Sequence, residues 1–82
     1  SYQYHYKREE HWTVVQGEAV VTLNDKNIVV NAGEHIHIPL QAKHRIANKT
    51  NQEVVFIEVQ YGSYFGEDDI VRIEDDYERE NI

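Results

Sequence analysis

Short runs rich in valine, isoleucine, threonine and aromatic residues fill most of the chain, and each of them ends at a turn signal. The runs include WTVVQGEAVVTLN, NIVVNAGEHIHIP and EVVFIEVQYG. Turn-forming residues interrupt them at Gly17, Asn24-Asp25, Ala32-Gly33, Pro39 and residues 48–52. Interruptions that recur roughly every eight to twelve residues are typical of antiparallel sandwiches and barrels. No apolar pattern of helical period persists before residue 67. The sequence therefore predicts an all-β fold.

Chain length limits how stable such a fold can be without help. With 82 residues the chain has room for one small domain, which buries only ~60–65 % of the surface that its unfolded form exposes. We expect a single domain over residues 1–82, supported by a bound metal or a second subunit. The chain has no cysteine, so nitrogen and oxygen atoms must hold any metal.

Acidic residues are concentrated at the end of the chain. Residues 67–82 hold eight of the fifteen acids, and we expect them to form a solvated acidic segment whose Ile70, Val71 and Ile73 pack on the body as a short helix or turn. The absence of a basic stripe argues against nucleic-acid binding. No apolar run reaches the ~20 residues of a membrane span and no signal-peptide pattern opens the chain, so we expect a soluble, cytoplasmic protein.

The stretch QYHYKREEHW, residues 3–12, gathers metal-binding and charged side chains. Gln3 and His5 have the same strand parity and project from one face; Glu10 and Trp12 share a face after the following turn. If both faces point inward, Gln3, His5 and Glu10 converge across a hairpin. Three candidate ligands would then come from eight residues.

The spacing of these residues resembles the two metal-binding motifs of the cupins, which fold as small jelly-roll barrels. The first motif is matched by Gln3-Tyr4-His5, followed after four residues by Glu10 and after six more by Gly17. Glutamine stands in place of the motif's first histidine. The second motif is matched at the positions Gly33, Pro39, His44 and Asn48, while Gln41 replaces its middle glycine. This resemblance implies a cupin, a double-stranded β-helix that binds one divalent metal through Gln3, His5, Glu10 and His44.

A narrower resemblance covers nearly the whole chain. The chain is similar to the type II mannose-6-phosphate isomerases, which are usually the C-terminal cupin of a bifunctional isomerase and mannose-1-phosphate guanylyltransferase. The similarity lies in the patterns QxHxxRxEHWxVVxG, IPxxxxHRxxN and IEVQxGxYxGEDDIxRxxDxY. Glu78 stands where that family has glycine. The strands that normally precede the first motif and the nucleotidyltransferase domain are absent from this sequence. We therefore expect no guanylyl transfer from this chain, and we expect exposed sheet edges, with Tyr2, Tyr4 and Tyr6 on an outer face, to favour a homo-oligomer.

The resemblance implies an isomerase that interconverts mannose 6-phosphate and fructose 6-phosphate, with zinc as the favoured metal. Arg8 shares the parity of Glu10, so its guanidinium can face the metal and stabilise an enediolate or the phosphate. We predict a catalytic role for Arg8 and substrate contacts from Lys43, Arg45 and Trp12. The sequence leaves the general base open. The candidates are Glu9, Glu58, His11 and Lys43.

Two other functions fit the same fold. A non-catalytic cupin could bind a sugar or sugar phosphate as a fragment or partner of a larger enzyme of GDP-mannose synthesis, and an iron oxygenase is disfavoured because Gln3 replaces a histidine. His35 and His37 also have ligand spacing, but we assign them to one strand face outside the site. The run from Gly66 to Asp69 lacks the oxygen spacing of a calcium loop, and we interpret it as a turn that starts a helix.

Overall fold

The computed structural model describes residues 2–74 of the chain, and within that range it contains strands and turns but no helix. Residues 2–74 therefore contain no helix that could cross a membrane. The rest of the predicted acidic segment, residues 75–82, lies outside the described residues. The described strands are β1 (Tyr2–Tyr4), β2 (Arg8–Gln16), β3 (Glu18–Leu23), β4 (Lys26–Asn31), β5 (His35–Ile38), β6 (His44–Ala47), β7 (Val55–Gly62) and β8 (Val71–Glu74).

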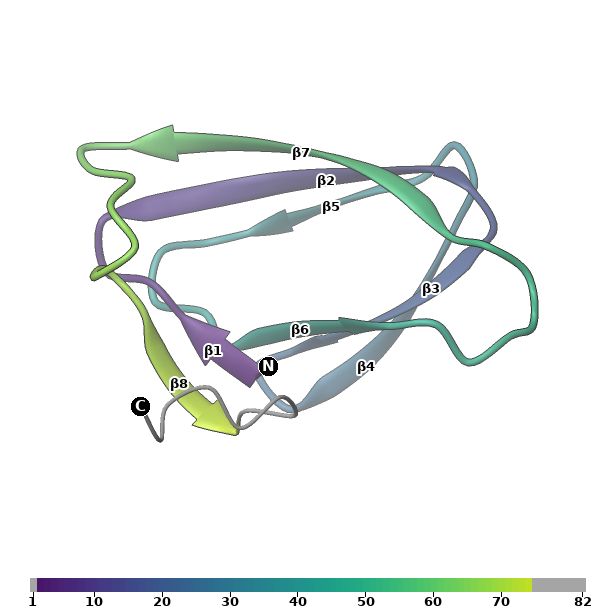
Figure 1. The fold of residues 1–82 in the computed structure, drawn as a ribbon, viewed down its shortest axis with the longest axis horizontal. Helices are drawn as coiled ribbons and strands as arrows, with labels where there is room; N and C mark the ends of the chain where they lie inside the picture. Colours follow the sequence, from purple (N-terminus) through teal and green to yellow (C-terminus); the bar gives the residue numbers. More distant parts are fainter. Residues whose placement is uncertain (1, 75–82) are drawn as a thin grey trace.

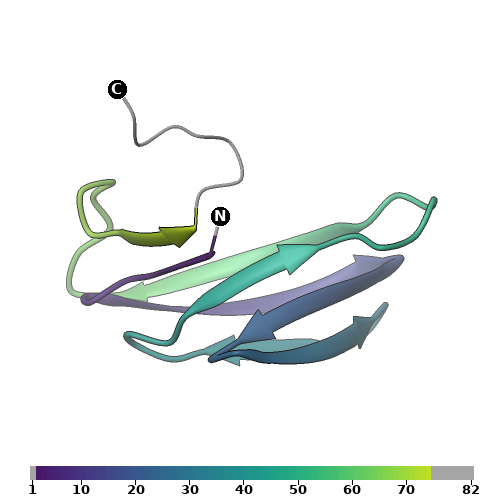
Figure 2. The same cartoon turned by 90° about the horizontal axis from the view of Figure 1, so that it is seen from below.

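These strands form two antiparallel sheets that face each other (Figure 1). One sheet has the order β4-β3-β6-β1-β8, and the other has the order β5-β2-β7. Seen from below, β2 and β7 run along one layer while β6 and β3 cross the other (Figure 2). The all-β cupin prediction is confirmed.

Strand β2 links the hydrophobic core to the polar end of the barrel. Its side chains alternate between the inside and the outside, as the sequence predicted, and Arg8, Glu10, Trp12 and Val14 are all buried. Val14 and Trp12 belong to the core cluster, together with residues such as Val21 and Ile38 from the strands around them. One face of one strand therefore changes from apolar to charged along its length, and Trp12 lies at the boundary.

Strand register places the two motifs opposite each other. In the pairing of β1 with β6, Gln3 lies directly across from His44, and residues opposite each other in an antiparallel pair share a face. The β3–β4 hairpin turns at Asn24 and Asp25, both with positive φ, as its turn signal predicted. Gly62 is required where β7 meets the β1–β2 turn, because a Cβ there would lie 2.2 Å from the main-chain oxygen of Lys7.

Two local predictions were wrong in part. The segment after Gly66 makes the expected turn and then continues as β8, which pairs with β1, so the helix that was the other expectation does not form in residues 66–74. Tyr2 is only 5 % exposed, and its hydroxyl donates to Asp25 Oδ1 at 2.8 Å and accepts from the Asp25 N–H. Only Tyr6 is an exposed member of the tyrosine series, with Tyr4 half-buried and edge-on to its ring.

Candidate metal centre

Two imidazoles and a carboxylate converge at the polar end of the barrel. His5 Nε2 lies 3.4 Å from Glu10 Oε2, and His44 Nε2 lies 3.5 Å from the same oxygen. One ligand atom from each residue falls within 4.8 Å of the others, and all three residues are buried. Within residues 2–74, no other group of three or more histidines and acids lies close enough together to hold a metal ion. Two nitrogens and one oxygen suit a divalent transition metal.

Backbone carbonyls orient both imidazoles. His44 Nδ1 donates to the carbonyl of Ala42 at 3.0 Å, and His5 Nδ1 lies 2.6 Å from the carbonyl of Asp69. A carbonyl oxygen can only accept, so each Nδ1 carries the proton and each Nε2 has its lone pair available. This is the usual second contact of a metal-binding histidine.

Electrostatics favour the ionised carboxylate of Glu10 and the neutral imidazole of His44, the states that a metal requires. Burial would raise the pKa of Glu10, but its close contact with His5 and the hydrogen bond from Trp12 lower it to about 2. Burial also lowers the pKa of His44, which favours the neutral imidazole. Trp12 Nε1 donates to Glu10 Oε1 at 2.9 Å and so leaves Oε2 facing the histidines. Trp12 therefore positions a candidate ligand.

Gln3 completes the side of the site formed by β1. Its amide nitrogen lies 3.4 Å from His5 Nε2, so the end of the side chain reaches the position where the imidazole lone pairs converge. The oxygen and nitrogen of an amide are interchangeable in shape, and a rotation of 180° would place Oε1 there. All four predicted ligands are thus close together.

The guanidinium of Arg8 enters the same space, as predicted from its parity. Arg8 is 8 % exposed; Nη1 lies 3.4 Å from Gln60 Oε1 and 3.3 Å from the carbonyl of Phe65. Its Nε is buried and has no hydrogen-bond partner among the described residues, nor does any carboxylate there form an ion pair with it. A buried cation with long contacts and an unsatisfied donor is suited to an anionic ligand.

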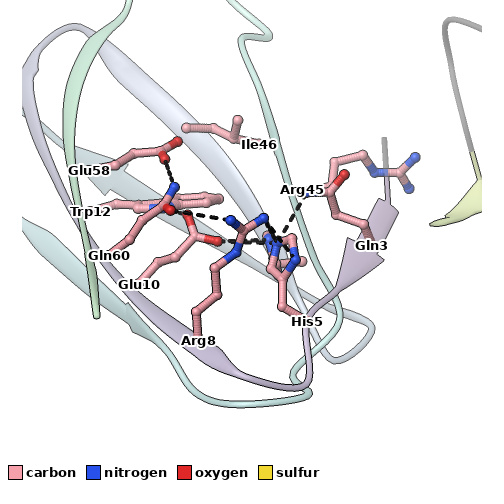
Figure 3. A pocket seen from close by; sticks show the side chains of 10 residues that line it. Gln3, His5, Arg8, Glu10, Trp12, Arg45, Ile46, Glu58 and Gln60 are labelled. Atoms are coloured by element: carbon pink, nitrogen blue, oxygen red, sulfur yellow. Dashed lines mark hydrogen bonds and ion pairs between the residues drawn. The ribbon is translucent and has the colours of Figure 1, made fainter. Parts of the chain in front are cut away.

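These side chains line a cavity of about 240 Å³ (Figure 3). Two of its residues come from β7: Glu58 lies across from Trp12, and Gln60 across from Glu10. Gln60 donates to Glu58 Oε2 at 3.2 Å and accepts from Arg8, which links the guanidinium to the acid. Partial desolvation, with the neighbouring Glu10 carboxylate, raises the pKa of Glu58, although its side chain remains exposed. Gln60 was missed from the sequence, although its parity with Glu58 would have identified it.

The other predicted substrate contacts lie at different distances from the centre. Trp12 lines the cavity, whereas Lys43 pairs with Asp25 at 2.8 Å and is not among the residues that line it. Arg45 borders the cavity, but its guanidinium lies 5.1 Å from the Tyr2 ring centroid, turned away from Arg8 and His5 (Figure 3).

The outer face of β5-β2-β7 contains the remaining histidines. His37 Nε2 lies 2.6 Å from Glu9 Oε1, and the His37 ring stacks on His11. His35 is exposed on the same face of β5. His35 and His37 thus share one exposed strand face, as predicted, and neither lines the cavity. Of the four general-base candidates, only Glu58 lines the cavity.

Known proteins resemble this chain over nearly all of its length. It is 48 % identical over 79 residues to the alginate biosynthesis protein AlgA of Pseudomonas aeruginosa, and 48 % identical to the xanthan biosynthesis protein XanB of Xanthomonas campestris. A mannose-1-phosphate guanylyltransferase of Klebsiella pneumoniae is 40 % identical. Each alignment covers 96 % of this chain but only 16 or 17 % of the relative. The chain therefore spans about a sixth of the length of these curated relatives.

A solved structure and a family model agree with this relationship. The plu4264 protein of Photorhabdus luminescens superimposes with a TM-score of 0.69 at 28 % identity, covering 74 % of this chain and 51 % of that one. The model described as mannose-6-phosphate isomerase C-terminal matches residues 1–75. The chain belongs to this family of mannose-6-phosphate isomerase C-terminal domains.

Proposed function

We propose that this domain catalyses the interconversion of mannose 6-phosphate and fructose 6-phosphate at the cavity between its sheets. The observation that carries the proposal is the buried Arg8 guanidinium beside the group of His5, Glu10 and His44. A sugar phosphate and the enediolate derived from it are both anionic, and Arg8 is a buried cation whose Nε has no hydrogen-bond partner among the described residues. Family membership supports this choice among the many reactions that cupins host.

The donor set fits a divalent ion, and we propose zinc held by Gln3, His5, Glu10 and His44. Both histidines use Nδ1 to contact a backbone carbonyl and direct Nε2 at Oε2 of the ionised Glu10. A bound ion would act as a Lewis acid toward the carbonyl and hydroxyl oxygens of the open-chain sugar. Four protein ligands or fewer leave a coordination position open for these oxygens.

Glu58 is the acid–base group that we propose for the proton transfer between C2 and C1. It lines the cavity, and partial desolvation and Glu10 raise its pKa, which favours a carboxyl group that can both accept and return a proton. Gln60 holds its Oε2, which leaves Oε1 to face the substrate. Arg8, linked through Gln60, stabilises the charge that grows on the sugar oxygens.

The proposal is tested by turnover of mannose 6-phosphate in a coupled assay with metal-loaded protein. We expect an active wild type and a Glu58→Gln variant whose kcat falls on the order of a hundredfold or more, the size of general acid–base catalysis, with unchanged metal content. Glu9→Gln, on the outer face, is the matched control and should retain activity. A metal-replete wild type that binds the sugar phosphate without converting it would instead indicate a non-catalytic binding domain.

A further inference from the structure

We propose that Asp69 is a positioning residue for the metal centre: it holds the turn that contains His5 and fixes the tautomer in which His5 can bind a metal. The proposal rests on the metal site proposed above. It concerns a residue that is not a candidate ligand and that lies in a segment far along the chain.

His5 needs support that strand pairing does not provide. Strand β1 ends at Tyr4 and β2 begins at Arg8, so His5 lies in the turn between them. The other histidine is different, because His44 belongs to β6 and donates to Ala42, two residues away. Local structure therefore orients His44, while His5 depends on contacts from elsewhere.

Asp69 supplies these contacts from a position 64 residues later. Its Oδ1 accepts from the Tyr6 N–H at 3.0 Å, and its Oδ2 accepts from the Lys7 N–H at 2.9 Å. Its main-chain carbonyl accepts from His5 Nδ1 at 2.6 Å. Both carboxylate oxygens and the backbone of one buried residue thus hold three consecutive residues of the turn.

The short contact with the carbonyl also decides between two tautomers of His5. An Nη2 of Arg8 lies 3.1 Å from the same Nδ1, and this donor would need Nδ1 to be unprotonated. The Asp69 carbonyl, 2.6 Å from Nδ1, requires a protonated Nδ1, because the lone pairs of the oxygen and of an unprotonated nitrogen would repel at that distance. The carbonyl contact is much shorter, so the proton resides on Nδ1 and Nε2 faces Glu10. Arg8 Nη2 is closer to Nδ1, at 3.1 Å, than to Nε2, at 3.5 Å. If Asp69 loosened, Arg8 would therefore favour the tautomer with a protonated Nε2, which cannot bind a metal through Nε2.

The test compares Asp69→Ala with Asp68→Ala. Asp68 is the adjacent acid, but it is exposed and its carboxylate accepts from the exposed Tyr64 hydroxyl. Affinity for Co²⁺ is measured by competition with a chromophoric chelator, and the visible spectrum of the saturated protein reports the geometry of the site. We expect Asp69→Ala to weaken Co²⁺ binding by about 10–100-fold, the usual effect of losing an outer-shell partner, and to alter the spectrum. Asp68→Ala should change neither.

A second measurement needs no metal. Nitrogen-15 NMR of the imidazoles in the metal-free wild type should show His5 protonated at Nδ1, and Asp69→Ala should move it toward the Nε2-protonated form, while His44 stays unchanged as an internal reference. If Asp69→Ala does not fold, Asp69→Asn keeps one acceptor oxygen and should give a smaller shift in the same direction. Unchanged His5 signals in either folded variant would overturn the proposal. A wild type with the expected tautomer but no Co²⁺ binding would instead reject the metal site.

Discussion

Replacement of Arg8 by lysine separates catalysis from binding at this site. The guanidinium spans three contacts: Gln60 Oε1, the Phe65 carbonyl and the His5 ring. A lysine retains the charge but has one ammonium group, which cannot keep these contacts and also present a donor to the substrate. If Arg8 stabilises charge that develops with the enediolate, the loss of this oriented donor should lower kcat on the order of a hundredfold or more, roughly 3 kcal/mol.

The assay measures kcat and KM for mannose 6-phosphate, binding of the sugar phosphate by calorimetry, and metal content. Arg8→Lys should lower kcat much more than it weakens binding, with metal content unchanged because Arg8 is not a proposed ligand. Arg45→Lys is the matched control: its guanidinium packs on Tyr2, so we expect a small effect. An active wild type whose Arg8→Lys variant keeps full turnover would refute the reasoning. An equal loss of affinity and kcat/KM with kcat retained would assign Arg8 to ground-state binding alone.

Two further predictions concern the metal and the assembly. His44→Ala should reduce bound metal from roughly stoichiometric to near background by elemental analysis, whereas the double variant His35→Ala with His37→Ala should keep it; the reverse pattern would show that the ligands are misassigned. We also propose that the domain is a homo-oligomer, because β7 is an edge strand with an exposed apolar row of Val55, Ile57, Val59 and Tyr61. Light scattering at micromolar concentration should give at least a dimer mass, and a well-folded monomer would contradict this.

The sequence predicted the fold and most of the candidate site because both depend on strand periodicity. The alternation along β2 predicts that Arg8, Glu10 and Trp12 share one face, and the structure buries all three. The segment after Gly66 was misread, since its acids and scattered apolar residues fit a turn and helix as well as a strand. Pairing with β1 decides the outcome, and that contact joins the two ends of the described chain. Local pattern contains no information about it.

Long-range contacts also explain how the site tolerates Gln41 in place of the middle glycine of the second cupin motif. At the position of the motif's middle glycine, Gln41 adopts φ 63°, the left-handed conformation that glycine enters without strain. A residue with a Cβ enters it at a cost of about 1–2 kcal/mol, yet the backbone geometry is retained. The Gln41 N–H then donates to the carbonyl of His5 at 2.8 Å, while the Ser63 N–H donates to that of Lys7 at 3.0 Å. The turn is therefore held from three separate segments, including the one that contains Asp69, so the strain at Gln41 can be borne without moving His5 out of reach of Glu10.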